Sequence, residues 1–111
     1  MKELARVGEV NKIFSLKDLD ASKHEQALGL RRLCLDKMAE ITIQSAHQKQ
    51  YEAEALKDLR KAKEADESTR PEDADWFRAK AETLRANAAH SRERVKQAGL
   101  ELDFIINRGI Q

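Results

Sequence analysis

From Phe77 to Ile105 the sequence is FRAKAETLRANAAHSRERVKQAGLELDFI, and its pattern is the strongest indication of the fold. Apolar and small residues recur in it at alternating steps of four and three, the heptad pattern of a seam between two packed helices. The seam positions are Phe77, Ala81, Leu84, Ala88, Ser91, Val95, Ala98, Leu102 and Ile105. We therefore expect one long helix over residues 70–107, with Gly109 as a left-handed C-cap.

Residues 23–66 contain a second seam with the same alternation of steps. Its positions are Cys34, Met38, Ile41, Ser45, Gln48, Glu52, Ala55, Leu59 and Ala62. Ser22 and Glu25 form an S-x-x-E pattern, which is typical of a capping box at the start of a helix. Between the two seams, Thr69 is the expected N-cap of the next helix, and Pro71 suits its first turn. The sequence thus predicts two long helices joined by a short loop.

A short loop requires the two helices to run antiparallel. Matching the seams then places Ala55 beside Leu84 and Cys34 beside Ile105. A shorter amphipathic helix is expected over residues 2–14, packed against one end of the pair. The predicted fold class is all-α: an antiparallel, coiled-coil-like helical hairpin, with the short N-terminal helix making a three-helix bundle at one end of a single helical domain, residues 1–111.

The composition agrees with this fold and excludes several classes of protein. The 111 residues include only four glycines and one proline, and a chain of this length makes one domain, too small for a large enzyme with an interdomain cleft. The single cysteine excludes an intramolecular disulfide. The charged N-terminus does not resemble a signal peptide, and no segment has the ~20 apolar residues of a membrane span. We expect a cytoplasmic protein with no membrane partner.

The 21 basic and 20 acidic residues nearly cancel, but the bases are clustered. Arg78, Arg85 and Arg92 recur at seven-residue steps, and Lys96 extends the row. One interpretation is that they flank the seam and pair with acids of the other helix. Candidate acids there are Glu40, Glu52 and Asp58. The alternative is a basic face that neutralises phosphates; since no aromatic residues alternate with the bases to stack nucleobases, we favour the first.

Residues suited to catalysis or metal binding are sparse. His47 and His90 occupy nearly facing positions, and two histidines with a carboxylate suit Zn²⁺, but the H-x-x-x-H and E-x-x-H spacings are absent. We interpret them as surface residues. Cys34 lies between two leucines, where a free cysteine behaves as a small buried hydrophobe, and there is no glycine-rich phosphate loop. We expect no enzyme activity, no cofactor and no metal.

Trp76, the only tryptophan, lies beside Phe77 close to the loop. Phe77 belongs to the seam, whereas Trp76, one position away, has no obvious core to fill. Tryptophan is enriched at the energetic centres of protein interfaces, which makes Trp76 a candidate binding residue. The alternative is that its ring folds over the loop as a lid on Leu59 and Ala62.

The functional expectation is a non-enzymatic protein–protein interaction module: an adaptor, chaperone or inhibitor. It would present the hairpin to another protein, or to itself as a homodimer, because a helix face binds through residues spaced by three and four without any catalytic group. The expected partner-binding residues are Trp76, Arg78, Arg85 and Arg92. The alternative function is nucleic-acid or nucleotide-phosphate binding through the basic face of the last helix.

Overall fold

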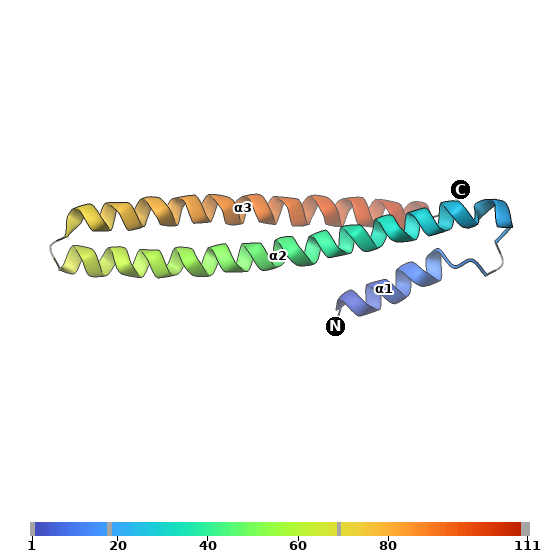
Figure 1. Ribbon diagram of the computed structural model, residues 1–111, viewed down its shortest axis with the longest axis horizontal. Coiled ribbons are helices and arrows are strands. Elements are labelled where there is room, and N and C mark those ends of the chain that lie inside the picture. The colour runs from blue at the N-terminus through green and yellow to red at the C-terminus, as the bar shows by residue number, and fades with distance from the viewer. Residues whose placement is uncertain (1, 18, 69, 110–111) are drawn as a thin grey trace. The chain divides into compact units, whose positions relative to one another are not determined.

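The computed structural model describes residues 2–17, 19–68 and 70–109, with side chains described from Arg6 onward. The elements are α1 (Lys2–Ile13), a single 3₁₀ turn η1 (Ala21–Lys23), α2 (His24–Glu67) and α3 (Pro71–Arg108) (Figure 1). The described residues include no strand. The predicted all-α helical hairpin is confirmed, and each helix has bounds within one residue of those expected.

The chain divides into two compact units. Unit 1 comprises residues 1–42 and 95–111, and so takes in α1, the first part of α2 and the last part of α3. Unit 2 comprises residues 43–94, which hold the rest of both long helices and the loop between them.

The start of α2 differs from the expected capping box. Ser22 lies inside the turn η1, and its side chain makes no hydrogen bond within the described part of the chain. The amide of Lys23 donates instead to the carbonyl of Asp20 at 2.9 Å. The Nε2 of His24 lies 3.2 Å from the carbonyl oxygen of Leu19 and holds the preceding segment against the helix. The Ser22–Glu25 prediction is wrong because a backbone turn occupies the position where a side chain would cap.

The other helix ends follow the expected chemistry. Pro71 is the first residue of α3, as predicted, because a missing amide costs nothing in a first helical turn. The predicted N-cap Thr69 lies outside the described residues. Gly109 has a φ of +65°, and its amide donates to Ile105 at 3.1 Å. This confirms the left-handed C-cap, a conformation that glycine adopts without a steric penalty.

Unit 1 contains the larger hydrophobic core. Its buried cluster is made up of Val10, Phe14, Cys34, Met38 and Leu102, with Ile105 packed against it. Cys34 is therefore buried and close to Ile105, as predicted. Arg31 donates to the carbonyl of Phe14 at 2.6 Å, and Arg6 pairs with Asp103 at 2.9 Å. These two contacts hold α1 against α2 and α3.

Unit 2 has a narrower seam, built mostly from alanine methyl groups. The buried alanines are Ala55, Ala62, Ala65, Ala74, Ala81 and Ala88. Ala55 and Leu84 belong to one cluster, as the predicted register requires. Each methyl contributes about 0.8 kcal/mol when buried. The seam of unit 2 is therefore held by many small apolar contacts.

Candidate functional site

A hollow of about 420 Å³ lies at the loop end of the hairpin, within unit 2. We call it the tip pocket, and it is lined by Lys61, Glu64, Arg70, Asp73, Trp76 and Phe77. Because α3 begins at Pro71, Asp73 lies one helical turn before Trp76 and Phe77 and shares their face. The residues of α2 complete the opposite wall.

Trp76 remains 60% exposed and lines the tip pocket, whose lining includes neither Leu59 nor Ala62, so it does not form the lid over these two residues. It packs edge-to-face against Phe77, with ring centroids 5.0 Å apart. The ammonium of Lys80 lies 5.5 Å from the centroid of the Trp76 ring, and that of Lys61 lies 5.7 Å from the Phe77 ring. Such edge-to-face and cation–π contacts each contribute about 0.5–1.5 kcal/mol. The tryptophan is therefore held in an exposed orientation by its neighbours.

Lys80 also contacts a buried carboxylate. Its ammonium lies 3.6 Å from the Oδ1 atom of Asp58, a residue that is only 2% exposed. The other oxygen, Oδ2, is buried and has no hydrogen-bond partner among the described residues. Asp58 was expected as a partner for an arginine, and its burial was not expected. Ala55, Asp58 and Ala62 are also related by steps of three and four, so the spacing allows Asp58 on the seam face without requiring it.

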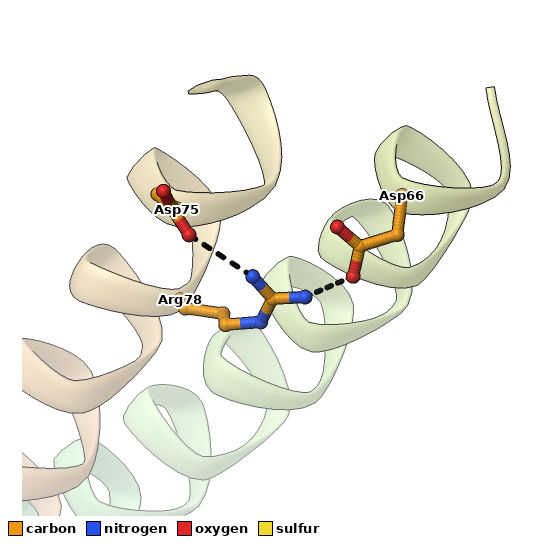
Figure 2. Close-up of polar contacts among 3 residues, drawn as sticks. All are labelled: Asp66, Asp75 and Arg78. Atoms are coloured by element: carbon orange, nitrogen blue, oxygen red, sulfur yellow. Dashed lines mark hydrogen bonds and ion pairs between the residues drawn. The ribbon is translucent and has the colours of Figure 1, made fainter. Parts of the chain in front are cut away.

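The arginine row follows the flanking interpretation at two of its three positions. Arg78 hydrogen-bonds Asp75 on its own helix at 3.1 Å and also bonds Asp66 of α2 (Figure 2). Arg92 donates to Glu52 at 3.2 Å. Hydrogen bonds from Gln48 and from Arg92 lower the pKa of Glu52 below its ordinary value. Both arginines therefore bridge α2 and α3.

Arg85, the middle arginine of the row, has no side-chain partner among the described residues. The reason lies in the spacing. Glu52 and Asp66 are separated by two heptads, and the position midway between them is Leu59, which is partly buried. Leu59 therefore occupies the place in the register where an acid for Arg85 would stand. Of the other expected acids, Glu40 pairs with Lys37 at 3.9 Å.

The predicted site residues do not form a single cluster. Trp76 lines the tip pocket, whereas Arg78, only two positions along α3, does not. Residues two apart on a helix point to different faces. The side chains that contact Trp76 are instead those of Phe77 and Lys80, and Lys61 contacts Phe77 in turn.

The two central histidines line one shallow hollow of about 260 Å³ in unit 2, as their facing register predicts. The ring of His47 lies 6.2 Å from that of Tyr51. No group of three histidine, cysteine, aspartate or glutamate side chains in the described ranges is placed to hold a metal ion. Burial raises the pKa of the Cys34 thiol, and the nearby charge of Arg6 opposes that shift. A thiol in this environment is a poor nucleophile.

Comparison of the chain with protein families, curated proteins and solved structures gives no match. Within the described residues, no helix has a stretch long and apolar enough to cross a bilayer.

Proposed function

We propose that the chain is a non-enzymatic protein-interaction module that binds a partner protein through the tip pocket, with Trp76 as the anchor. The observation that carries the proposal is the exposed, supported ring of the only tryptophan, at the edge of a hollow of about 420 Å³. An adaptor, a chaperone and an inhibitor can all act simply by binding a surface of their partner protein. None of the three needs a catalytic group.

The size of the exposed ring surface supports the proposal. Complete burial of an aromatic side chain removes about 150–250 Å² from water. Covering the exposed 60% of Trp76 then contributes about 3 kcal/mol at ~25 cal/mol per Å², or roughly 100-fold in Kd. Phe77 and Lys80 already restrict the ring, so little further conformational entropy is lost on binding.

The rim of the tip pocket has the mixed character of a protein interface. Lys61 and Arg70 supply positive charge, and Glu64 and Asp73 supply negative charge, with Arg70 and Asp73 paired at 3.6 Å. An aromatic centre inside a polar, two-signed rim resembles the anatomy of interface hot spots. The lone, buried Cys34 suits a reducing compartment. We place the proposed activity in the cytoplasm.

Phosphate binding through the arginine row has weaker support. Arg78 and Arg92 already contact carboxylates, which compete with phosphate for the same donors. Arg85 and Lys96 are the members of the row without such a contact in the described part of the chain. If only these two cations contact phosphates, the binding constant for a nucleic acid should fall only slightly as salt rises. The slope of log K against log [salt] would correspond to two phosphates at most.

Site-specific photocrosslinking tests the proposal. A photoreactive phenylalanine analogue replaces Trp76 in one variant and Leu56 in a matched control, which is 56% exposed on α2 of the same unit. We expect a discrete protein adduct from position 76 in cells and none from position 56. Competition with excess wild-type chain should remove that adduct, whereas a Trp76→Ala chain should compete about 100-fold less well. Equal adducts at both positions, or equal competition by both chains, would refute the proposal.

A further inference from the structure

Unit 1 exposes an apolar face made of Leu33 on α2 and of Leu100 and Phe104 on α3. These side chains are 43%, 58% and 63% exposed, respectively. They line a hollow of about 370 Å³ together with Lys37, Glu101 and Ile105. A second hollow of about 250 Å³ shares Phe104 and Ile105 with the first and adds Leu30. The two hollows therefore adjoin at Phe104 and Ile105, while Gln26, Arg108 and Gly109 line the far side of the second.

This face is exposed because α1 covers a different side of the helix pair. Val10 of α1 and Phe14, the residue directly after this helix, pack with Cys34 and Leu102. Around their helices, Cys34 points about 100° away from Leu33, and Leu102 points about 160° away from Phe104. The first part of α2 is apolar nearly all around, and such a helix needs cover on several sides. Within unit 1, α1 and α3 supply two of those sides. The apolar face is one side left open, and Leu28 and Leu35, 47% and 36% exposed, lie on another side of α2.

The charge at this face indicates the kind of partner. The charged residues lining the first hollow are Lys37 and Glu101, and they pair with each other. Their hydrogen bond raises the pKa of Lys37 and lowers that of Glu101. At the far end, the guanidinium of Arg108 lies 6.0 Å from the Phe104 ring centroid, where it is suited to remain at a wet rim. The centre of the face is neutral, so electrostatic attraction favours neither a strongly acidic nor a strongly basic partner surface.

The available area fits a second copy of the chain. In unit 1, α2 contributes residues 24–42 and α3 contributes residues 95–108, which span about 20–28 Å at 1.5 Å per residue. Two adjacent helices are about 20 Å wide. A face of about 500 Å² on each copy buries about 1,000 Å² in total, the lower limit for a specific interface. A pair of this size is reversible, with a Kd in the micromolar range.

We propose that a second copy of the chain covers this face in a two-fold symmetric dimer, with Leu33, Leu100 and Phe104 at its centre. A neutral apolar face is complementary to an identical face, which is the condition for an isologous interface. The dimer does not depend on the proposed binding at the tip pocket, which lies in unit 2. It carries two tip pockets, and so gives avidity toward any partner that presents two binding sites.

Sedimentation equilibrium over about 1–200 μM tests the dimer, since this range brackets a micromolar Kd. The wild-type chain should pass from monomer to dimer across the range. Leu100→Glu should weaken association at least 10-fold, because it would bury a carboxylate at the centre of the interface. The matched control Leu56→Glu replaces an equally exposed leucine in unit 2 and should dimerise as the wild type does. Both residues are exposed, so both variants should keep the wild-type circular dichroism.

Salt provides a second measurement. At about 1 M salt, where the Debye length is about 3 Å, an apolar interface keeps its association constant. A wild-type chain that stays monomeric at the highest concentration overturns the proposal. So does a Leu100→Glu chain that dimerises normally, a Leu56→Glu chain that fails equally, or a dimer that dissociates in high salt. None of these results bears on crosslinking at Trp76, so the two proposals fail independently.

Discussion

The ammonium of Lys80 on α3 lies 3.6 Å from the carboxylate of Asp58, which is buried on α2. A buried carboxylate is costly unless a charge or hydrogen bond compensates it. Here one lysine compensates Asp58 and also contacts the ring of Trp76. The same side chain therefore contributes to holding the two helices together and to orienting the candidate anchor.

Lys80→Met should destabilise the protein by about 1–3 kcal/mol, because it leaves the Asp58 carboxylate buried and unpaired. We place the value below the usual range for a buried pair, since Lys80 itself is half exposed. The double variant Asp58→Ala with Lys80→Met should recover most of this loss. Urea unfolding followed by circular dichroism measures both. A double variant no more stable than Lys80→Met would show that the pair is not the source of the effect.

Arg78 and Arg85 should differ in their importance for stability, although both are exposed members of one row. Arg78→Glu places an acid against Asp66 and Asp75 and should cost about 1 kcal/mol. Arg85→Glu removes no side-chain contact within the described residues and should change stability by less than about 0.5 kcal/mol. The comparison requires low salt, and the difference should shrink as salt is added. Equal costs would mean that Arg85 has an acidic partner in solution.

Heptad spacing predicted the seam residues well because the helical period is a local property of the chain. The same spacing did not predict the burial of Asp58. From Ala55 to Ala62, steps of three then four pass through Asp58, while steps of four then three pass through Leu59. Whether Asp58 or Leu59 faces α3 more directly depends on how α2 is rotated about its axis, and tertiary contacts set this rotation. In the observed rotation, Asp58 is buried within reach of Lys80.

The candidate site and the start of α2 show two further limits. An apolar first half of α2 predicts that several sides need cover, but only the position of α1 determines that Leu33 stays exposed. The S-x-x-E pattern at Ser22 predicts a side-chain cap, yet the backbone turn before His24 makes that cap unnecessary. The exposure of Trp76 was predicted as one of two alternatives. Its lysine contacts depend on the packing of α2 against α3.

The helical glycines offer a stability test with an internal contrast. A Cβ atom added at Gly29 or Gly99 meets nothing within 4 Å, so replacing either by alanine should stabilise the protein by about 0.5–1 kcal/mol through helix propensity. Gly109→Ala also meets open space but has a φ of +65°, and should destabilise by about 1 kcal/mol. Thermal unfolding at one protein concentration measures all three. A loss of stability at Gly29 or Gly99 would show that a neighbour, such as a second copy, approaches that backbone.

Cys34 should react slowly with thiol reagents and should make stability fall at alkaline pH. Burial holds the pKa of its thiol above the ordinary value, so the folded protein keeps the proton after the unfolded chain has begun to lose it. The stability that this contributes is complete below about pH 8.5 and is lost as pH rises above that value. Labelling with a coloured disulfide reagent at pH 8 should be limited by opening of the core, and moderate urea should accelerate it. Between about pH 7.5 and 9.5, the free energy of unfolding should fall less steeply with pH for Cys34→Ala than for the wild type. Labelling within seconds in native buffer, or identical slopes for the two proteins, would contradict the burial of Cys34 beneath α1.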